Sequence, residues 1–190
     1  QTIVLAAAED EHVLQAVHTA VTQDLSDFIL VGDKEQIIQK AESVSLHLSG
    51  IPIIDEKEPM NAAAAAVQLI RDKKADILMK GMVSSADLLK AVLHKKYGLR
   101  IGEMMSMAAV FEIPAYHKLL VLTDPAVNHI QDLKHKAGML ENGIKVCHVL
   151  GIRRPKAAPL CSIETLNPAM QATVDAVILQ EMAEKGIIMD

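Results

Sequence analysis

The feature that most constrains this chain is a repeated alternation between short apolar runs and stretches in which apolar residues recur at helical spacing. Strand-like runs occupy positions 2–7, 28–31, 51–54 and 76–80, and a helix-like stretch follows each of them. Strands that are apolar on both faces and alternate with helices are typical of a parallel sheet covered on both sides. The sequence therefore predicts an α/β fold built on a parallel sheet.

Turn and capping residues separate these strands from their helices. The acidic residues Glu9, Asp10 and Glu11 follow the first run, where negative charge favours the start of a helix. Gly32 and Asp33 form a turn signal before the second helix. The alanine run at 62–66 has the strongest helix propensity in the chain and predicts a closely packed helix.

The rhythm changes in the second part of the chain. Two strand candidates, 107–113 and 119–123, are separated by a short Pro-containing segment, which predicts a hairpin rather than a helical crossover. A long helix over 131–150, a strand around 157–161 and a last helix over 168–185 are expected to follow. We place a domain boundary near Glu112, with one α/β domain at 1–112, a second at 113–190, and a cleft between them.

Composition restricts the class of partner. Aromatic residues make up 2% of the chain, with no Trp, so it has few faces on which single-stranded nucleic acid can stack. The net charge of −5 also argues against binding to a polyanion. A small anionic ligand remains compatible, because a few local cations suffice. The expected partners are therefore small molecules and not nucleic acid.

Cysteine, histidine and hydropathy patterns indicate a cytoplasmic protein without a metal site. Cys147 and Cys161 have no spacing typical of zinc ligands or of a disulfide framework. The 8 histidines show no HxH or HExxH pattern. No apolar run approaches the roughly 20 residues that cross a membrane. We expect a soluble protein that binds neither metal nor membrane.

The first candidate site follows the fourth strand, because ligands in open α/β sheets bind beyond the carboxyl ends of strands. Gly81 allows close approach of the backbone, Lys80 supplies a cation, and a serine can cap the next helix or donate a hydroxyl. These residue types predict a small anion site, made of Lys80, Gly81, Ser84 and Ser85. The alternative is an ordinary turn with a serine cap and a solvated lysine.

Other candidate residues lie further along the chain. Arg100 stands between Gly98 and Gly102 and offers a fork of donors that fits phosphate or carboxylate, although an ordinary surface arginine is the alternative. Asp124 and Asn128 follow a strand, where such residues also commonly do no more than build a turn.

Four stretches, in this order, resemble the phosphate acyltransferase family, which comprises butyryl and acetyl branches. They are LMKGMVSSADLLKAVL at 78–93, YGLRIGEMMSMAAVFEIP at 97–114, LLVLTDPAVN at 119–128 and LCSIETLNPAMQATVDA at 160–176. The resemblance implies a two-domain α/β architecture similar to the isocitrate and isopropylmalate dehydrogenases, with the active site in the interdomain cleft.

The resemblance also implies an activity, the reversible transfer of a short acyl group between coenzyme A and inorganic phosphate. Coenzyme A and phosphate would be substrates, with no tightly bound cofactor and a homo-oligomeric enzyme. Arg100 would neutralise the phosphate, Ser106 would be a second catalytic residue, and Asp124 and Asn128 would line the cleft. The Lys80-Gly81 form of the motif favours the butyryl branch.

Members of the family continue beyond the point that matches Asp190, and the extra segment carries residues tied to coenzyme A binding and thiol deprotonation. We therefore expect both domains to be incomplete, and a molecule that ended at Asp190 to be inert. Two other classes stay open. A dehydrogenase would need a group of acidic metal ligands, of which only Asp124 is a candidate. A non-catalytic module that binds acyl-CoA or phosphate is the third possibility.

Overall fold

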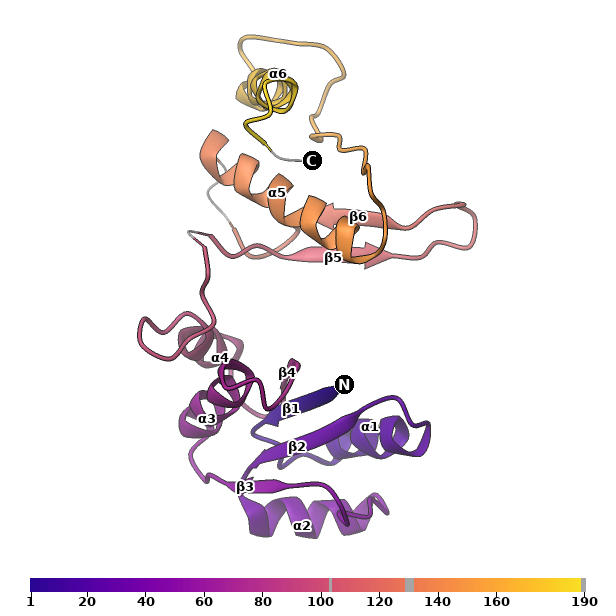
Figure 1. Ribbon diagram of the computed structural model, residues 1–190, viewed down its shortest axis with the longest axis vertical. Coiled ribbons are helices and arrows are strands. Elements are labelled where there is room, and N and C mark those ends of the chain that lie inside the picture. Colours follow the sequence, from indigo (N-terminus) through magenta and orange to yellow (C-terminus); the bar gives the residue numbers. More distant parts are fainter. Residues whose placement is uncertain (103, 129–131, 189–190) are drawn as a thin grey trace. The chain divides into compact units, whose positions relative to one another are not determined.

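The computed structural model describes residues 1–102, 104–128 and 132–188 (Figure 1). The chain forms two compact units, Gln1–Ile101 and Gly102–Asp190, and each is described by itself. This division lies earlier in the chain than the boundary that the sequence predicts, which is near Glu112. Residue 131, the expected start of the long helix, lies outside the described residues, as does Asp190.

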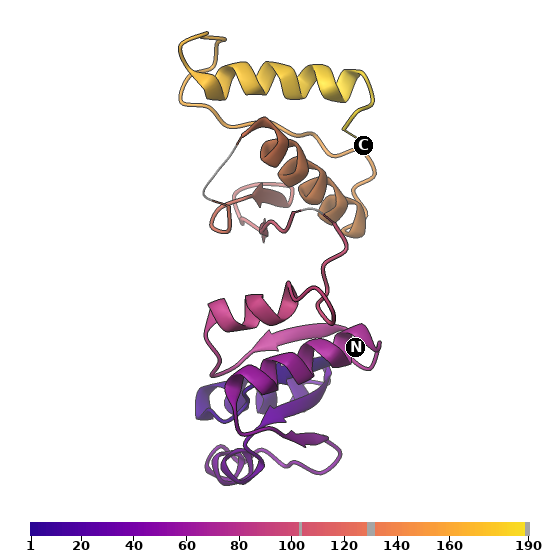
Figure 2. The same ribbon diagram turned by 90° about the vertical axis from the view of Figure 1, so that its left-hand side faces the viewer.

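The first unit is a parallel sheet of four strands with helices on both faces (Figures 1 and 2). The strand order is β3-β2-β1-β4, and every pairing is parallel, which confirms the predicted fold class. Its strands and helices are β1 (Thr2–Ala6), α1 (Glu11–Thr22), β2 (Asp27–Gly32), α2 (Lys34–Ser43), β3 (Ile53–Asp55), α3 (Pro59–Arg71), β4 (Ile77–Lys80) and α4 (Ser85–Val92).

Strand β1 is central because it pairs with β2 on one side and β4 on the other. Its alternating side chains enter two separate cores, one on each face of the sheet. Val4 packs with α3 and α4, whereas Leu5 packs with α1 and α2, and both are fully buried. The buried alanines of α3, as predicted, pack closely on the sheet, and they are Ala62, Ala63 and Ala66.

The helices begin at the capping residues that the sequence indicates. The Asp10 carboxylate accepts a hydrogen bond from the Val13 amide at 3.0 Å, and Asp33 accepts from the Glu35 and Gln36 amides. Each cap satisfies amides that have no partner inside the helix.

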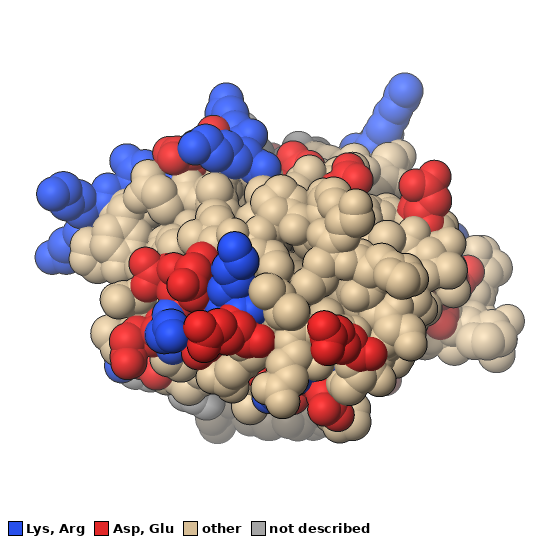
Figure 3. Space-filling view, turned by 90° about the horizontal axis from the view of Figure 1, so that it is seen from below, with Lys and Arg blue, Asp and Glu red and all other residues tan. Residues whose placement is uncertain are grey.

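Figure 3 shows the molecule from below the view of Figure 1. On this face acidic and basic side chains lie next to one another, and uncharged residues cover the larger areas between them.

The second unit combines an antiparallel hairpin with two helices. Strands β5 (Ala108–Phe111) and β6 (Leu120–Thr123) pair from Ala108↔Thr123 to Phe111↔Leu120, which confirms the predicted hairpin. The helices α5 (Leu133–Val149) and α6 (Gln171–Glu184) follow.

The predicted strand at 157–161 is wrong. The segment forms no ladder with β5 or β6 and has no regular secondary structure. Pro155 and Pro159 offer a physical reason, since proline has no amide hydrogen to donate to a neighbouring strand. The apolar pattern alone did not distinguish an extended connection from a strand.

A mostly buried ion pair joins α5 to α6. The Lys136 ammonium lies 2.7 Å from the Asp175 carboxylate, which is 5% exposed. The Gln171 side-chain amide donates a second hydrogen bond to Asp175 at 2.8 Å. The Lys136 hydrogen bond, followed by that of Gln171, holds the pKa of Asp175 below its ordinary value. The charge is therefore compensated on both carboxylate oxygens.

Within the described ranges, no helix is long and apolar enough to cross a membrane.

Gly81→Ala should destabilise the first unit. A methyl group at this position would lie 2.0 Å from the Ala7 carbonyl oxygen, so two backbone segments would have to separate. We expect a loss of about 2 kcal/mol in the free energy of unfolding, measured by urea denaturation. Gly102→Ala is the control, because its methyl group meets nothing within 4 Å. Equal effects of the two substitutions would contradict this steric account.

Candidate active site residues

The turn between β4 and α4 lies against the end of β1. The Gly81 amide donates to the Ala6 carbonyl at 2.8 Å, and the Met82 amide donates to the Ala7 carbonyl at 2.7 Å. Because a side chain at Gly81 would collide with Ala7, glycine is required here by the packing of the protein itself. The turn is thus placed at the carboxyl edge of the sheet, as the sequence predicts.

Lys80 and Ser84 both bind groups of their own loop. The Lys80 ammonium donates to the carbonyls of Gly81 and Val83 at 3.2 and 3.1 Å. The Ser84 hydroxyl accepts from the Asp87 amide at 3.0 Å and donates to the Asp87 carboxylate at 2.7 Å. Ser84 is therefore the N-cap of α4, with both its donor and its acceptor capacity engaged. Ser85 is the exposed first residue of that helix.

Arg100 lies at the other end of α4. The Leu99 amide binds the carbonyl of Val92, the last residue of the helix, and Arg100 follows it. Ser84 precedes the first turn of the same helix. The first unit therefore does not bring the Arg100 backbone next to the β4–α4 turn. The joint phosphate pocket of Lys80, Gly81, Ser84, Ser85 and Arg100 stays a prediction.

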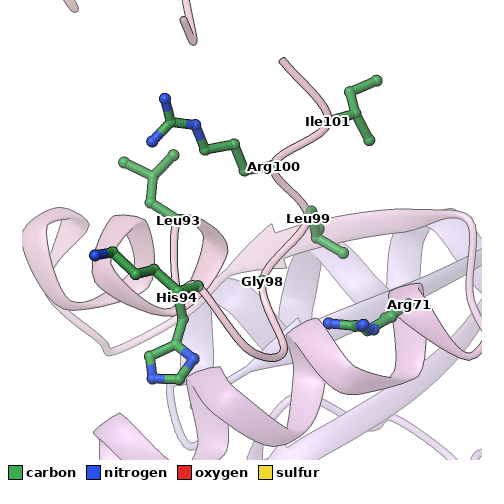
Figure 4. A pocket seen from close by; sticks show the side chains of 8 residues that line it. Arg71, Leu93, His94, Gly98, Leu99, Arg100 and Ile101 are labelled. Carbon is green, nitrogen blue, oxygen red and sulfur yellow. The ribbon is translucent and has the colours of Figure 1, made fainter. Parts of the chain in front are cut away.

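A cavity of about 570 Å³ lies beside the Arg100 loop. Its walls come from the end of α3 and from the segment after α4 (Figure 4). They include the cationic side chains of Arg71, Lys95 and Arg100, together with His94. Arg100 is exposed and directed away from Arg71 (Figure 4). The first unit thus has a second group of cations, separate from Lys80.

Ser106 is held by α5 of the second unit. Its hydroxyl oxygen accepts a hydrogen bond from the Asn142 side-chain amide at 2.8 Å. The next residue, Met107, accepts a hydrogen bond from the Thr123 hydroxyl at 2.8 Å. Because the hydroxyl of Ser106 is an acceptor in this contact, its own hydrogen can be donated to another group.

Asp124 and Asn128 form one hydrogen-bonded loop with the segment that carries Ser106. The Asp124 carboxylate accepts from the amides of Ala126 and Val127 at 3.0 and 2.9 Å. The Asn128 side-chain amide lies 2.5 Å from the other carboxylate oxygen and 2.9 Å from the Met105 carbonyl. Three of the residues singled out from the sequence are therefore brought together in the second unit.

The ionised form of Asp124 is strongly favoured over the protonated form. Desolvation raises its pKa, but the amides of Val127 and Ala126 and the side chain of Asn128 outweigh this effect and hold the pKa to about 2. A carboxylate with so low a pKa is a poor proton acceptor near neutral pH. Its evident task is to fix the segment 124–128 that follows β6.

Some polar residues of these sites were not singled out from the sequence. Asn142 lies inside α5, and a polar residue followed by Gly143 within a helix is only a weak sign of a functional contact. The sequence indicates Glu9 only as part of the start of a helix, yet its Oε2 atom is buried without a hydrogen-bond partner in the described part of the chain. It packs against Gly32, where a methyl group would lie 2.0 Å from it. Only the folded sheet brings these two loops together.

The described residues contain no group of three or more His, Cys, Asp or Glu side chains that could hold a metal ion. Cys147 and Cys161 are both free thiols.

Comparison with solved structures shows that the chain has the fold of the phosphotransacylases. The crystal structure of a branched-chain phosphotransacylase from Enterococcus faecalis V583 matches with a TM-score of 0.80 at 27% identity, over 95% of this chain and 63% of that one. The likeness to dehydrogenases stays a prediction.

The chain belongs to the phosphate acetyl/butyryl transferase family. The family model, described as "Phosphate acetyl/butaryl transferase", matches residues 1–64 and 57–187. Over 98% of its own length, the chain is 44% identical to the phosphate butyryltransferase of Clostridium beijerinckii. Over 99% of its own length, it is 39% identical to the probable phosphate butyryltransferase of Bacillus subtilis. It spans 62% of the length of each of these relatives.

Stability should depend on the ionisation of Asp124. Because the folded pKa of about 2 lies below the ordinary value of 3.8, the stabilisation is full above pH 4 and is lost as pH falls through 2. The shift sets an upper bound of about 2 kcal/mol at neutral pH, and solvent screening of this partly exposed carboxylate lowers the contribution below that bound. Asp124→Asn should therefore lower the free energy of unfolding at pH 6 and lower it much less at pH 2.5, measured by urea denaturation.

Asp24→Asn is the matched control, because the exposed Asp24 side chain makes no hydrogen bond within the described residues. An Asp124→Asn effect that is the same at both pH values would contradict the assignment.

Proposed function

We propose that the protein containing this chain transfers a short acyl group, preferentially butyryl, between coenzyme A and inorganic phosphate. The observation that carries the proposal is 44% identity to a phosphate butyryltransferase over nearly the whole chain. A phosphate acetyltransferase from Thermotoga maritima is less similar, at 36% identity, which favours butyryl over acetyl. Whether the chain instead binds these ligands without turnover is an outcome of the test below.

The reaction needs two kinds of stabilisation. A phosphate oxygen attacks the thioester carbonyl carbon, a C–O bond forms, negative charge develops on the carbonyl oxygen, and the C–S bond then breaks to release the thiolate of coenzyme A, which takes up a proton. Cations must hold the phosphate, and a hydrogen-bond donor must stabilise the oxyanion. No metal ion is required in this scheme.

Arg100 is the residue to which we assign phosphate neutralisation. Its guanidinium is exposed at the end of a rigid loop, beside the cations of the adjoining cavity. We propose that a second side of the phosphate site is formed by Lys80, Gly81, Ser84 and Ser85. Because Ser84 is engaged as a helix cap, its contribution is to fix the turn that carries Lys80.

Ser106 is the residue to which we assign stabilisation of the oxyanion. Asn142 donates to its oxygen, so the hydroxyl hydrogen is oriented away from Asn142 and available to a substrate oxygen. Asp124 and Asn128 fix the adjacent loop and are proposed to line the same substrate site.

We further propose that the enzyme acts in the cytoplasm as a homo-oligomer. Both strands of the hairpin carry exposed apolar side chains, a pattern common at subunit contacts. They are Val110, Phe111, Leu120 and Leu122.

The test is thiol release by the natural full-length protein, with acetyl-, butyryl- or isobutyryl-CoA and with or without phosphate. We expect phosphate-dependent release, with kcat/KM for butyryl-CoA about tenfold or more above that for acetyl-CoA, since each methylene contributes about 1–3 kcal/mol. No phosphate-dependent release with any of the three substrates would refute the proposal. Calorimetric binding of coenzyme A without turnover would instead establish a binding module.

Ser106→Ala should separate chemistry from binding. Removal of an oxyanion donor lowers kcat by about 100-fold, and KM for phosphate should stay within about twofold. Ser162→Ala is the control, because Ser162 is an exposed serine of the same unit. If kcat of Ser106→Ala equals that of the control, Ser106 has no catalytic role.

A further inference from the structure

We propose that Arg71 is a positioning residue for Arg100, which it serves by fixing the backbone of the loop between them. The inference rests on the proposed function, in which Arg100 holds the phosphate. Arg71 is in the last turn of α3, and its guanidinium donates a hydrogen bond to the Lys96 carbonyl. A hydrogen bond from a charged donor is about twice as strong as a neutral one.

The geometry indicates that Arg71 acts through the backbone. In Figure 4 the Arg71 side chain points toward the turn that precedes Gly98, whereas Arg100 points away from it. The two guanidinium groups therefore face different directions. The contact spans 25 sequence positions, so Arg71 joins the end of one helix to the loop that follows the next.

The other contacts make this loop a rigid support. The His94 ring stacks on Tyr97 with centroids 3.7 Å apart, and its Nδ1 atom accepts from the Lys96 amide at 3.3 Å. The Gly98 amide binds the His94 carbonyl at 2.8 Å. A methyl group at Gly98 would lie 2.4 Å from the Val92 carbonyl oxygen, so the loop closes onto the end of α4.

The loop transmits its position to Arg100 because it ends in the core. Tyr97 and Leu99 pack against the buried residues under α3 and α4, and Arg100 is the next residue. Arg71 holds the exposed side of the same turn at Lys96. Loss of this contact frees that side of the turn, and a small displacement of a charged group can cost a large factor in catalysis.

A direct role of Arg71 as a second phosphate ligand is the competing explanation, since it also lines the 570 Å³ cavity. The two explanations differ in whether the effect of Arg71 depends on Arg100. Residues that act through each other give non-additive effects in a double-mutant cycle, whereas independent ligands give additive effects.

The experiment measures KM for phosphate and for butyryl-CoA in the natural full-length protein and in Arg71→Met, Arg100→Met and the double variant. We expect Arg71→Met to raise KM for phosphate on the order of tenfold and to leave KM for butyryl-CoA within about twofold. In the Arg100→Met background, Arg71→Met should change KM for phosphate by less than about twofold. Arg71→Lys, which keeps a cationic donor, should restore most of the loss.

Lys74→Met is the matched control. Lys74 lies three positions from Arg71, is exposed, and its side chain makes no hydrogen bond or ion pair within the described residues. The substitution removes the same charge and should leave both KM values unchanged. Equal effects of Arg71→Met in both Arg100 backgrounds, or an effect no larger than that of Lys74→Met, would overturn the proposal.

Hydrogen exchange gives a readout that does not depend on activity. The amides of Gly98 and Leu99 should exchange on the order of tenfold faster in Arg71→Met than in the natural protein, and Lys74→Met should not change them. Unchanged exchange in Arg71→Met would overturn the proposal even if KM rises. If the natural protein shows no phosphate-dependent turnover, the proposed function fails, and the exchange rates alone decide whether Arg71 fixes the loop.

Discussion

The first unit depends on the burial of β1 at the centre of its sheet. The strand pairs on both edges, and its side chains enter a core on each face, so each neighbouring strand and helix is placed relative to it. The close contact between Gly81 and Ala7 extends this dependence to the β4–α4 turn. The position of a candidate anion-binding turn is thus a consequence of backbone packing, and no side chain could be added there without moving β1 from β4.

The second unit depends on polar contacts to a larger extent. Within the residues that the structure describes, its sheet has two strands, and an isolated hairpin is marginally stable in water. Specific side chains hold its parts together. The Asp124 carboxylate fixes the segment after β6, Asn142 of α5 binds Ser106, and the Lys136–Asp175 ion pair joins α5 to α6. The candidate catalytic serine is therefore held by the same contacts that hold the unit together.

The sequence predicts best those features of the fold whose physical signal is local. Alternating apolar runs predicted the parallel sheet, and a short Pro-containing segment predicted the hairpin. The strand at 157–161 was wrong because an apolar run does not reveal whether a pairing partner exists. The motif at 78–93 identified the turn with Lys80 and a serine cap of the next helix, and the structure shows that Ser84 is that cap. The family followed from four motifs together, because their order is more specific than any one of them.

The sequence by itself determined the α/β class, the alternation of strands and helices in the first unit and membership of the family, because periodicity and motif order are properties of neighbouring residues. Only the tertiary structure decided that Asn142 supports Ser106 and that Arg71 reaches the Lys96 carbonyl. These relationships join residues distant in the chain, and the packing of helices on the sheet sets them. No local pattern in the sequence records such a contact, since each partner taken alone is an ordinary polar residue.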